Sequence, residues 1–393
     1  MEAGNLAKNL PRMMLALLWL APVGVALPGC QRQAAPRFVS SKGALALTAD
    51  LEGDEEELKL MQGLQKQIVA QLETRCGTPS APKMLADDSI DAAHLKRGAQ
   101  VFMRRCQPCH GVSGDGNGPV ARYMHPRPRD YRQGIFKFTT TPYGSMPRRE
   151  DILRTLKRGV TGTSMPSFQR VSQEDREAVA DYVIALAKRG QLEIQLVALA
   201  EEEEELDPEF VQEAAADIAT QWQVAQKQQV MPVSKMPDMT PETIAEGHAM
   251  FLKMACSRCH GKNGRGGSIG NVEVGKDAWG HKAAAADLTS GMFHGGGRPI
   301  DIYRRIYSGI NGTPMPAFGK TFQDTPDTIW HLVHFIKDTG ERRRRGKALL
   351  KTASASPLGH DSKPKDSADS KKTDPKKSGS SGEQNIQPSQ SAA

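Results

Sequence analysis

The chain has 393 residues, enough for two or three compact domains. Only 5% of its residues are aromatic and 37 are glycine, so the large side chains that usually fill a core are scarce, and a bulky bound group such as a macrocycle is expected to replace part of them. The formal charge of +7 suits an acidic protein or an anionic membrane surface, whereas nucleic acid is not an expected partner, because the basic residues are dispersed and no nucleic-acid-binding module accompanies them.

The amino terminus is typical of an export signal. Lys8 and Arg12 precede an apolar run of fourteen residues, 13–26, whereas a membrane-spanning helix needs about 20. We therefore expect residues 1–29 to be a signal peptide or lipoprotein signal that is removed. The residues that end at Cys30 are similar to the lipobox of bacterial lipoproteins, in which the cysteine is lipidated, although their proline departs from that pattern. Lipidation, simple cleavage and a short uncleaved anchor all stay open.

A linker is expected between the signal and the first domain, over residues 30–88. A charged, glutamine-rich pattern at 54–75 predicts one helix within it. Cys76 follows this helix, and the sequence assigns it no function.

Residues 89–190 have the pattern of a small helical domain. Asp88 and Ser89 are expected to cap a helix that runs into a cysteine motif. A closing amphipathic helix is predicted over 173–188. The chain between the two helices is rich in Gly and Pro, and long loops of that kind are uncommon in a compact domain unless a large ligand orders them.

Residues 239–342 repeat this design. Thr240 is expected to begin the first helix of the second domain, and 327–337 to form its closing helix. Between the domains, residues 191–238 are predicted to be a charged helical connector. Residues 343–393 lack the apolar side chains needed to fold and are expected to form a disordered tail.

Four of the six cysteines form two copies of one pattern, in which a histidine directly follows the second cysteine. The copies are Cys106, Cys109 and His110, and Cys256, Cys259 and His260. This pattern is typical of covalent haem c attachment, because cysteines three residues apart share one face of a helical turn and can form thioethers with one porphyrin, while the histidine binds its iron. Disulfides and a shared zinc ion are the other interpretations, and zinc would leave both histidines without a role.

A constant offset of 150 residues relates the two domains. Residues 151–168 match 301–318, and in both copies a methionine follows the motif histidine by 55 residues. A methionine thioether favours ferrous iron and suits electron transfer more than oxygen chemistry. The predicted axial iron ligands are therefore His110 with Met165, and His260 with Met315.

Other side chains in the loops compete for the iron. Met146 also precedes a proline, and Met124 and Met292 lie in suitable loops, but Met165 alone recurs at the same spacing. On composition alone, a methionine is more often a core filler than a ligand. Bis-histidine ligation is a further alternative, with His125, His281 and His294 as candidates that we otherwise interpret as surface residues or neighbours of the haem carboxylates.

These motifs resemble the class I cytochrome c family in its bacterial tandem, diheme form, over about residues 89–190 and 239–340. The resemblance implies an all-α fold of two cytochrome-c-like domains, in each of which a few short helices surround a haem c and the first helix crosses the last through a glycine and an aromatic pair. The matching residues are Gly98, Phe102 and Tyr182, and Gly247, Phe251 and Phe335. In this family a proline carbonyl holds the outer nitrogen of the histidine. The first domain offers Pro119, Pro126 and Pro128 for this role, and the second offers no clear proline.

The resemblance implies an electron carrier with two haems c. We expect it to pass single electrons between a redox donor and an acceptor protein, as a shuttle or as a subunit of a respiratory complex. We expect it in the periplasm or elsewhere outside the cytoplasmic membrane, held to the membrane by a lipid or an N-terminal anchor, and no catalytic residue is predicted. The alternatives are a diheme peroxidase, or another haem enzyme with an open iron site, and a haem-regulated sensor or scaffold.

Six arginines crowd the loops between the predicted ligands of the first iron. We expect some to neutralise haem carboxylates and others to attract an acidic redox partner, a contact that salt should weaken. They are Arg122, Arg127, Arg129, Arg132, Arg148 and Arg149.

Overall fold

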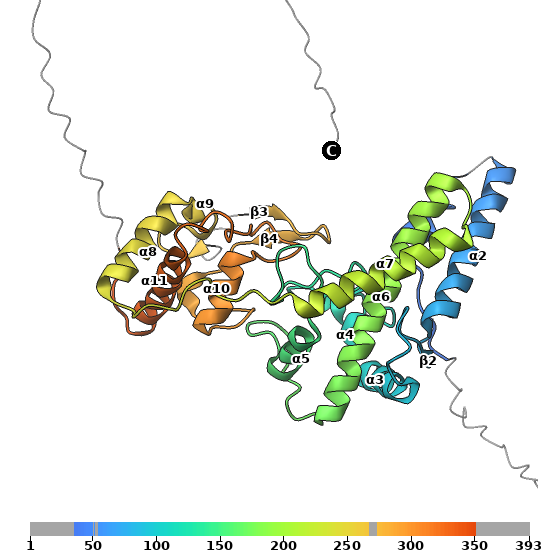
Figure 1. The fold of residues 1–393 in the computed structure, drawn as a ribbon, viewed down its shortest axis with the longest axis horizontal. Helices are drawn as coiled ribbons and strands as arrows, with labels where there is room; N and C mark the ends of the chain where they lie inside the picture. The colour runs from blue at the N-terminus through green and yellow to red at the C-terminus, as the bar shows by residue number, and fades with distance from the viewer. Residues whose placement is uncertain (1–34, 50, 52–53, 267–272, 351–393) are drawn as a thin grey trace, which may run out of the picture. The chain divides into compact units, whose positions relative to one another are not determined.

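Helices make up most of the folded chain (Figure 1). The computed structural model describes residues 35–49, 51, 54–266 and 273–350, so the predicted signal, Cys30 and most of the predicted tail lie outside the described residues. The α-helices of the described chain are α1 (Lys42–Ala46), α2 (Glu55–Cys76), α3 (Ala92–Arg105), α4 (Gln107–His110), α5 (Arg149–Arg158), α6 (Gln173–Glu203), α7 (Pro208–Lys227), α8 (Pro241–Lys253), α9 (Cys256–His260), α10 (Pro299–Tyr307) and α11 (Asp327–Arg344).

Strands contribute little to this part of the chain. Two antiparallel hairpins pair β1 (Gly77–Thr78) with β2 (Ala81–Pro82) and β3 (Glu273–Lys276) with β4 (Lys282–Ala284). Short 3-10 turns are η1 (Ala121–Tyr123) and η3 (Leu288–Ser290). The predicted all-α fold class is therefore confirmed.

Capping side chains explain where the helices begin. Thr240 caps α8, as the sequence indicated, and Asp54 caps α2. The cap of α3 is Asp91 and not the predicted pair at 88–89. Its carboxylate accepts a hydrogen bond of 2.8 Å from the backbone N–H of His94, which satisfies one of the free donors in the first turn.

α3 crosses α6 at Gly98, where no side chain would fit. A Cβ at this position would lie 2.1 Å from the carbonyl oxygen of Ala178. Phe102 and Tyr182 are fully buried beside the crossing, with ring centroids 5.3 Å apart in an edge-to-face arrangement. This is the glycine and aromatic pair that the family resemblance implied.

α8 and α11 repeat this crossing in the second domain. A Cβ on Gly247 would lie 1.9 Å from the carbonyl oxygen of His331, and the rings of Phe251 and Phe335 lie 5.0 Å apart. Both domains thus bring two helix backbones so close together that only glycine is tolerated at the contact.

α6 is longer than predicted. The sequence suggested an end near residue 188, but the helix continues to Glu203 because residues such as Leu192 and Leu196 keep a fully buried apolar stripe along it. The predicted start of the connector, at residue 191, lies inside this helix. α2 and α7 both pack against α6, and their buried residues join the core of the first domain.

The segment ahead of α2, residues 35–49, packs beside the first cysteine motif. The backbone N–H of Val39 donates a 2.6 Å hydrogen bond to Oγ of Ser113, three residues after His110. The backbone N–H of Ser41 donates a 2.6 Å hydrogen bond to a carboxylate oxygen of a buried glutamate on α6. This part of the predicted linker is therefore held against the first domain.

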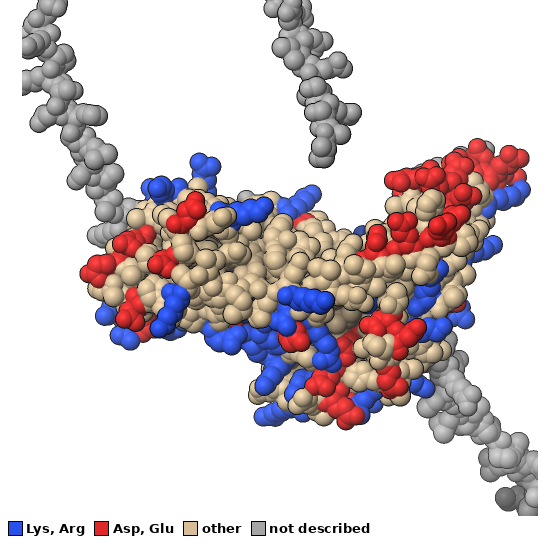
Figure 2. Space-filling model, in the orientation of Figure 1, with Lys and Arg blue, Asp and Glu red and all other residues tan. Residues whose placement is uncertain are grey.

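Charged side chains are unevenly distributed over the surface. Figure 2 shows acidic side chains gathered over α2 and the neighbouring end of α6 and α7, where the glutamates at 55–57 and 201–205 are exposed. The formal charge of +7 therefore coexists with a strongly acidic surface on the helices next to the first domain. Among the described residues, no helix is both long and apolar enough to cross a membrane.

Candidate functional site

The first cysteine motif lies at the junction between α3 and α4. Cys106 ends α3, and α4 carries Cys109 and His110. The His110 side chain is buried and its ring stacks on Tyr131, with ring centroids 4.8 Å apart. Nδ1 of His110 donates a 3.0 Å hydrogen bond to the backbone carbonyl of Arg129. Burial lowers the pKa of His110 to about 4, so its imidazole is neutral, the form that binds metals.

The second motif has the same arrangement on α9. Ala255 adopts a left-handed conformation, with φ of 56°, and turns the chain from α8 into the helix that holds Cys256, Cys259 and His260. Nδ1 of His260 donates a 3.0 Å hydrogen bond to the backbone carbonyl of Ala286. Burial lowers the pKa of this imidazole as well.

These two hydrogen bonds determine which ring nitrogen can bind a metal. Because Nδ1 carries the hydrogen, Nε2 presents its lone pair, and an outer hydrogen bond of this kind orients a ligand and raises its basicity. In the first domain the hydrogen bond of His110 is accepted by the carbonyl of Arg129, the residue after Pro128. The prediction that a proline carbonyl accepts it is therefore wrong. Neither acceptor was identifiable from the sequence, since every residue carries a backbone carbonyl.

The two methionine loops share one hydrogen-bond pattern. In the first, the backbone N–H of Met165 donates to Oγ1 of Thr163 at 3.1 Å, and this hydroxyl donates to the carbonyl of Val160 at 2.8 Å. The equivalent distances in the second loop are 3.3 and 2.8 Å, for Met315, Thr313 and Ile310. The offset of 150 residues therefore repeats a local geometry as well as a sequence.

Glycine lets each methionine loop return toward the helix before it. Gly159 has a φ of 67°, and a Cβ there would lie 2.7 Å from the carbonyl oxygen of Met165. Gly309 has a φ of 64°, with the same 2.7 Å distance to the carbonyl oxygen of Met315. A residue with a side chain at either position would be strained and would push the loop away.

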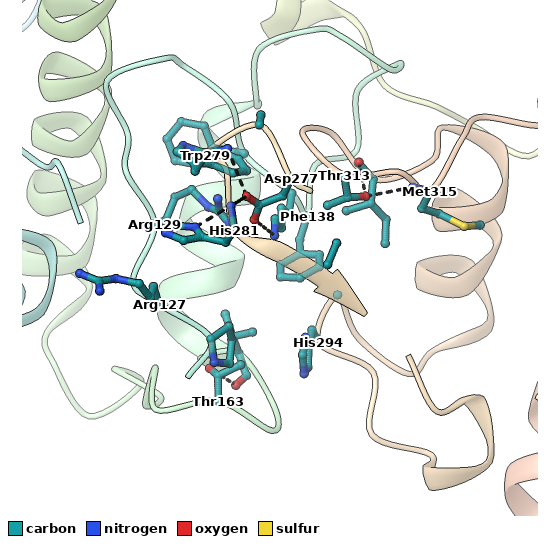
Figure 3. Close-up of a pocket in the computed structure, with 18 of the residues that line it drawn as sticks. Arg127, Arg129, Phe138, Thr163, Asp277, Trp279, His281, His294, Thr313 and Met315 are labelled. Carbon is teal, nitrogen blue, oxygen red and sulfur yellow. Dashed lines mark hydrogen bonds and ion pairs between the residues drawn. The ribbon is translucent and has the colours of Figure 1, made fainter. Parts of the chain in front are cut away.

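Both cysteine motifs and both methionines line one cavity of about 2430 Å³. A pocket for one drug-sized ligand measures about 300–1,000 Å³, so this cavity has room for two large groups. Figure 3 shows part of its lining, with Thr313 and Met315 from the second methionine loop and Thr163 from the first. Paired thiols, a neutral imidazole with a free Nε2 and a nearby thioether loop are the donors that a covalently attached haem requires. The residues therefore fit this group.

Most of the competing ligands also line the cavity. Those that do are Met124, His125, His281, Met292 and His294. Met146 is not among the lining residues, and its sulfur accepts a hydrogen bond of 3.6 Å from the side-chain amide of Gln191. The shared hydrogen-bond pattern favours Met165 and Met315 over all of these.

Half of the six loop arginines are paired within the chain. The pairs are Arg132 with Asp130 at 2.8 Å, Arg148 with Glu150 at 3.2 Å and Arg149 with Asp181 at 2.6 Å. Arg127 and Arg129 line the cavity, and the guanidinium of Arg127 donates to the amide oxygen of Asn117 at 3.1 Å. Fewer of these charges are available to a partner than the sequence suggested.

The cysteines within the described part of the chain are free thiols. Burial raises the pKa of Cys106 to about 12 and that of Cys76 to about 12, so both are protonated and Cys76 is an inert member of the core. A zinc ion shared by the two motifs would need several ligand side chains close together. Among the described residues, no group of three His, Cys, Asp or Glu side chains is placed to hold a metal ion.

Comparisons with known proteins match the chain around both motifs. The family described as cytochrome C oxidase, cbb3-type, subunit III matches residues 93–183 and 242–336. The chain is 31% identical over 99 residues to cytochrome c6 of Cyanidioschyzon merolae, an alignment that covers 25% of this chain and 81% of the relative. A chain of the reducing HAO-like protein complex of Kuenenia stuttgartiensis has a TM-score of 0.49 and 32% sequence identity, covering 62% of this chain and 96% of that one.

Proposed function

Because this chain belongs to the cytochrome c family, we propose that it is a diheme c-type cytochrome that carries single electrons between redox proteins. The family binds haem c, and the two matched segments, 93–183 and 242–336, each contain one cysteine motif and one methionine loop. This duplication supports one haem c in each domain.

The observation that carries the proposal is that one complete donor set occurs twice. Each motif histidine gives its Nδ1 hydrogen to a backbone carbonyl at 3.0 Å, and each methionine loop is closed by a threonine hydroxyl. A coincidence could produce one such set, but two sets that line the same cavity support two haem sites of one design.

We assign the following roles to the side chains. Cys106 and Cys109 would hold the first haem through thioethers, and His110 and Met165 would be the ligands of its iron. In the second domain the same roles fall to Cys256, Cys259, His260 and Met315. Haem supplies the one-electron couple, while the protein prevents loss of the group, excludes other ligands and, through the methionine sulfur, raises the reduction potential.

A diheme peroxidase is the alternative function. It requires an iron with an open face, and the presence of the same methionine loop in both domains, with the same hydrogen bonds, favours two closed sites and hence a carrier. Whether the carrier is a free shuttle or a subunit of a respiratory complex, we propose that it works outside the cytoplasmic membrane, attached there through a lipid on Cys30 or through an N-terminal anchor.

The proposal is tested on protein matured in a host that attaches haem c. The intact mass should correspond to two haems, and replacing Cys106 and Cys109 by serine should remove one of them. Reduced wild-type protein should not bind carbon monoxide, because both irons are closed. A mass without haem would contradict the cytochrome, whereas two haems and ready carbon monoxide binding would favour the peroxidase.

A further inference from the structure

Arg129 makes two contacts, one through its backbone and one through its side chain. Its backbone carbonyl accepts the hydrogen bond of His110, the predicted ligand of the first iron, at 3.0 Å. Its guanidinium lies over the indole ring of Trp279, with the central carbon 3.5 Å from the ring centroid. Figure 3 shows Arg129 beside Trp279. Trp279 belongs to the second domain, so Arg129 contacts both a predicted ligand of the first iron and a side chain of the second domain.

The indole of Trp279 is held firmly against the second methionine loop. A Cβ on Gly312 would lie 2.7 Å from the indole ring, so the ring packs directly on this glycine, three residues before Met315. The backbone at and just before Trp279 is also held by hydrogen bonds, because the N–H of Ala278 donates to the carbonyl of Gly312 at 3.0 Å and the N–H of Trp279 donates to the carboxylate of Asp277 at 3.1 Å.

A salt bridge joins the domains at the same place. Lys137, from the first domain, pairs with Asp277 at 3.1 Å, and its ammonium lies 5.4 Å from the centroid of Trp279. Among the described residues Arg129 has no ion pair, so the face of the indole is the contact that fixes its guanidinium. A stacked arginine loses this fit when the ring is removed.

We infer that Arg129 is a positioning residue through which the second domain controls the first haem site. The chain of contacts runs from the second methionine loop through Gly312 and Trp279 to Arg129, and from its carbonyl to His110. The inference rests on the proposed function, since it concerns how one iron ligand is held. The second domain lacks a matching link, because the acceptor for His260 is the carbonyl of Ala286, whose side chain is a single methyl group.

The physical consequence is a shift of reduction potential. An outer hydrogen bond makes the imidazole a stronger donor, and a stronger donor stabilises ferric iron. Without the indole, the guanidinium of Arg129 loses its support, the backbone at this residue loosens and the bond from His110 weakens. The potential of the first haem should then rise.

The test compares Trp279→Ala with Trp279→Phe in the full diheme chain. Potentiometric titration gives both reduction steps, and a Met165→Ala variant identifies which step belongs to the first haem. Exchange of the Nδ1 hydrogen of His110 with deuterium, followed by NMR, reports the hydrogen bond directly. We expect Trp279→Ala to raise the first potential and speed the exchange, and Trp279→Phe, which keeps an aromatic face, to restore both.

Two further variants keep the test decisive. Arg129→Lys retains the charge and the backbone carbonyl but loses the planar stacking, so it should shift the first potential in the same direction even if Trp279→Ala fails to mature. Tyr123→Ala is the matched control, because it also removes an aromatic ring that lies against an arginine. The central guanidinium carbon of Arg122 lies 4.7 Å from the centroid of the Tyr123 ring, and Tyr123 is 75% exposed. It should change neither step.

An unchanged first potential in variants that hold both haems would overturn the inference and leave the proposed function intact. A shift confined to the second haem, or one that Trp279→Phe fails to restore, would also overturn it. Absence of haem from the wild-type protein would instead contradict the proposed function itself.

Discussion

The backbone N–H of Met165 is held by the hydroxyl of Thr163, at 3.1 Å. The hydroxyl in turn donates to Val160 at 2.8 Å, so one side chain closes the loop at both ends. Met315 and Thr313 are related in the same way, at 3.3 Å. The position of each proposed sulfur ligand therefore depends on a threonine two residues before it.

Replacing Thr163 by valine should weaken methionine ligation at the first iron. The change keeps the shape of the side chain but removes a donor and an acceptor, at a cost of about 1 kcal/mol. Added imidazole should then displace the methionine about fivefold more readily, which a titration followed in the visible spectrum measures. Thr163→Ser, which keeps the hydroxyl, should behave as wild type. Equal imidazole affinity in the valine variant and wild type would show that the loop does not need this hydroxyl.

Alanine at Gly98 should destabilise the first domain. Its Cβ would lie 2.1 Å from the carbonyl oxygen of Ala178, so α3 and α6 must separate, with a loss of about 1–3 kcal/mol or more in the free energy of unfolding. Gly63→Ala is the matched control, because nothing lies within 4 Å of a Cβ there and alanine favours a helix by up to about 1 kcal/mol. Denaturant unfolding should move the two variants in opposite directions.

Replacing Asp301 by asparagine should lower stability in a pH-dependent way. Burial alone would raise the pKa of this carboxyl, but the hydrogen bonds and charge of Arg298 and the charge of Arg158 outweigh it and lower the pKa overall. The carboxylate therefore stabilises the fold at neutral pH, and this contribution is lost as the pH falls through the lowered pKa.

Unfolding free energies at two pH values check this prediction. At pH 7 the Asp301→Asn variant should be less stable than wild type by about 1–3 kcal/mol. The difference should shrink below about pH 4, where carboxyl groups protonate. Asp324→Asn, at an exposed position, serves as the control and should be neutral throughout. A difference that stays constant with pH would rule out an ionised Asp301 as its source.

Much of the fold could be predicted because the same sequence pattern occurs in both domains. The family resemblance implied helix crossings at the glycines at 98 and 247 and their aromatic neighbours, and the crossings lie at these residues. The equal spacing from each motif histidine also distinguished Met165 and Met315 from the other methionines, and their loops have the same hydrogen bonds. A repeated pattern is informative because two copies rarely keep the same residues by chance.

The contacts that the sequence could not predict are of two kinds. The acceptors for the two histidines are backbone carbonyls, of Arg129 and Ala286, and backbone groups leave no trace in residue type. The contact of Arg129 with Trp279 depends on how two domains meet, which periodicity within either domain does not reveal. The length of α6 was also missed, because Gly190, two residues after the predicted end, is typical of a helix stop, whereas tertiary packing extends the helix through it to Glu203.

The most direct test of the central claim, that a histidine and a methionine hold each of two irons, is potentiometric titration of single methionine variants. We expect Met165→Ala to lower one reduction step and Met315→Ala the other, because loss of the thioether removes the preference for ferrous iron. Met146→Ala, which removes a methionine outside the lining of the cavity, should leave both steps unchanged. Two reduction steps that stay at their wild-type potentials after both Met165 and Met315 are replaced would contradict the claim.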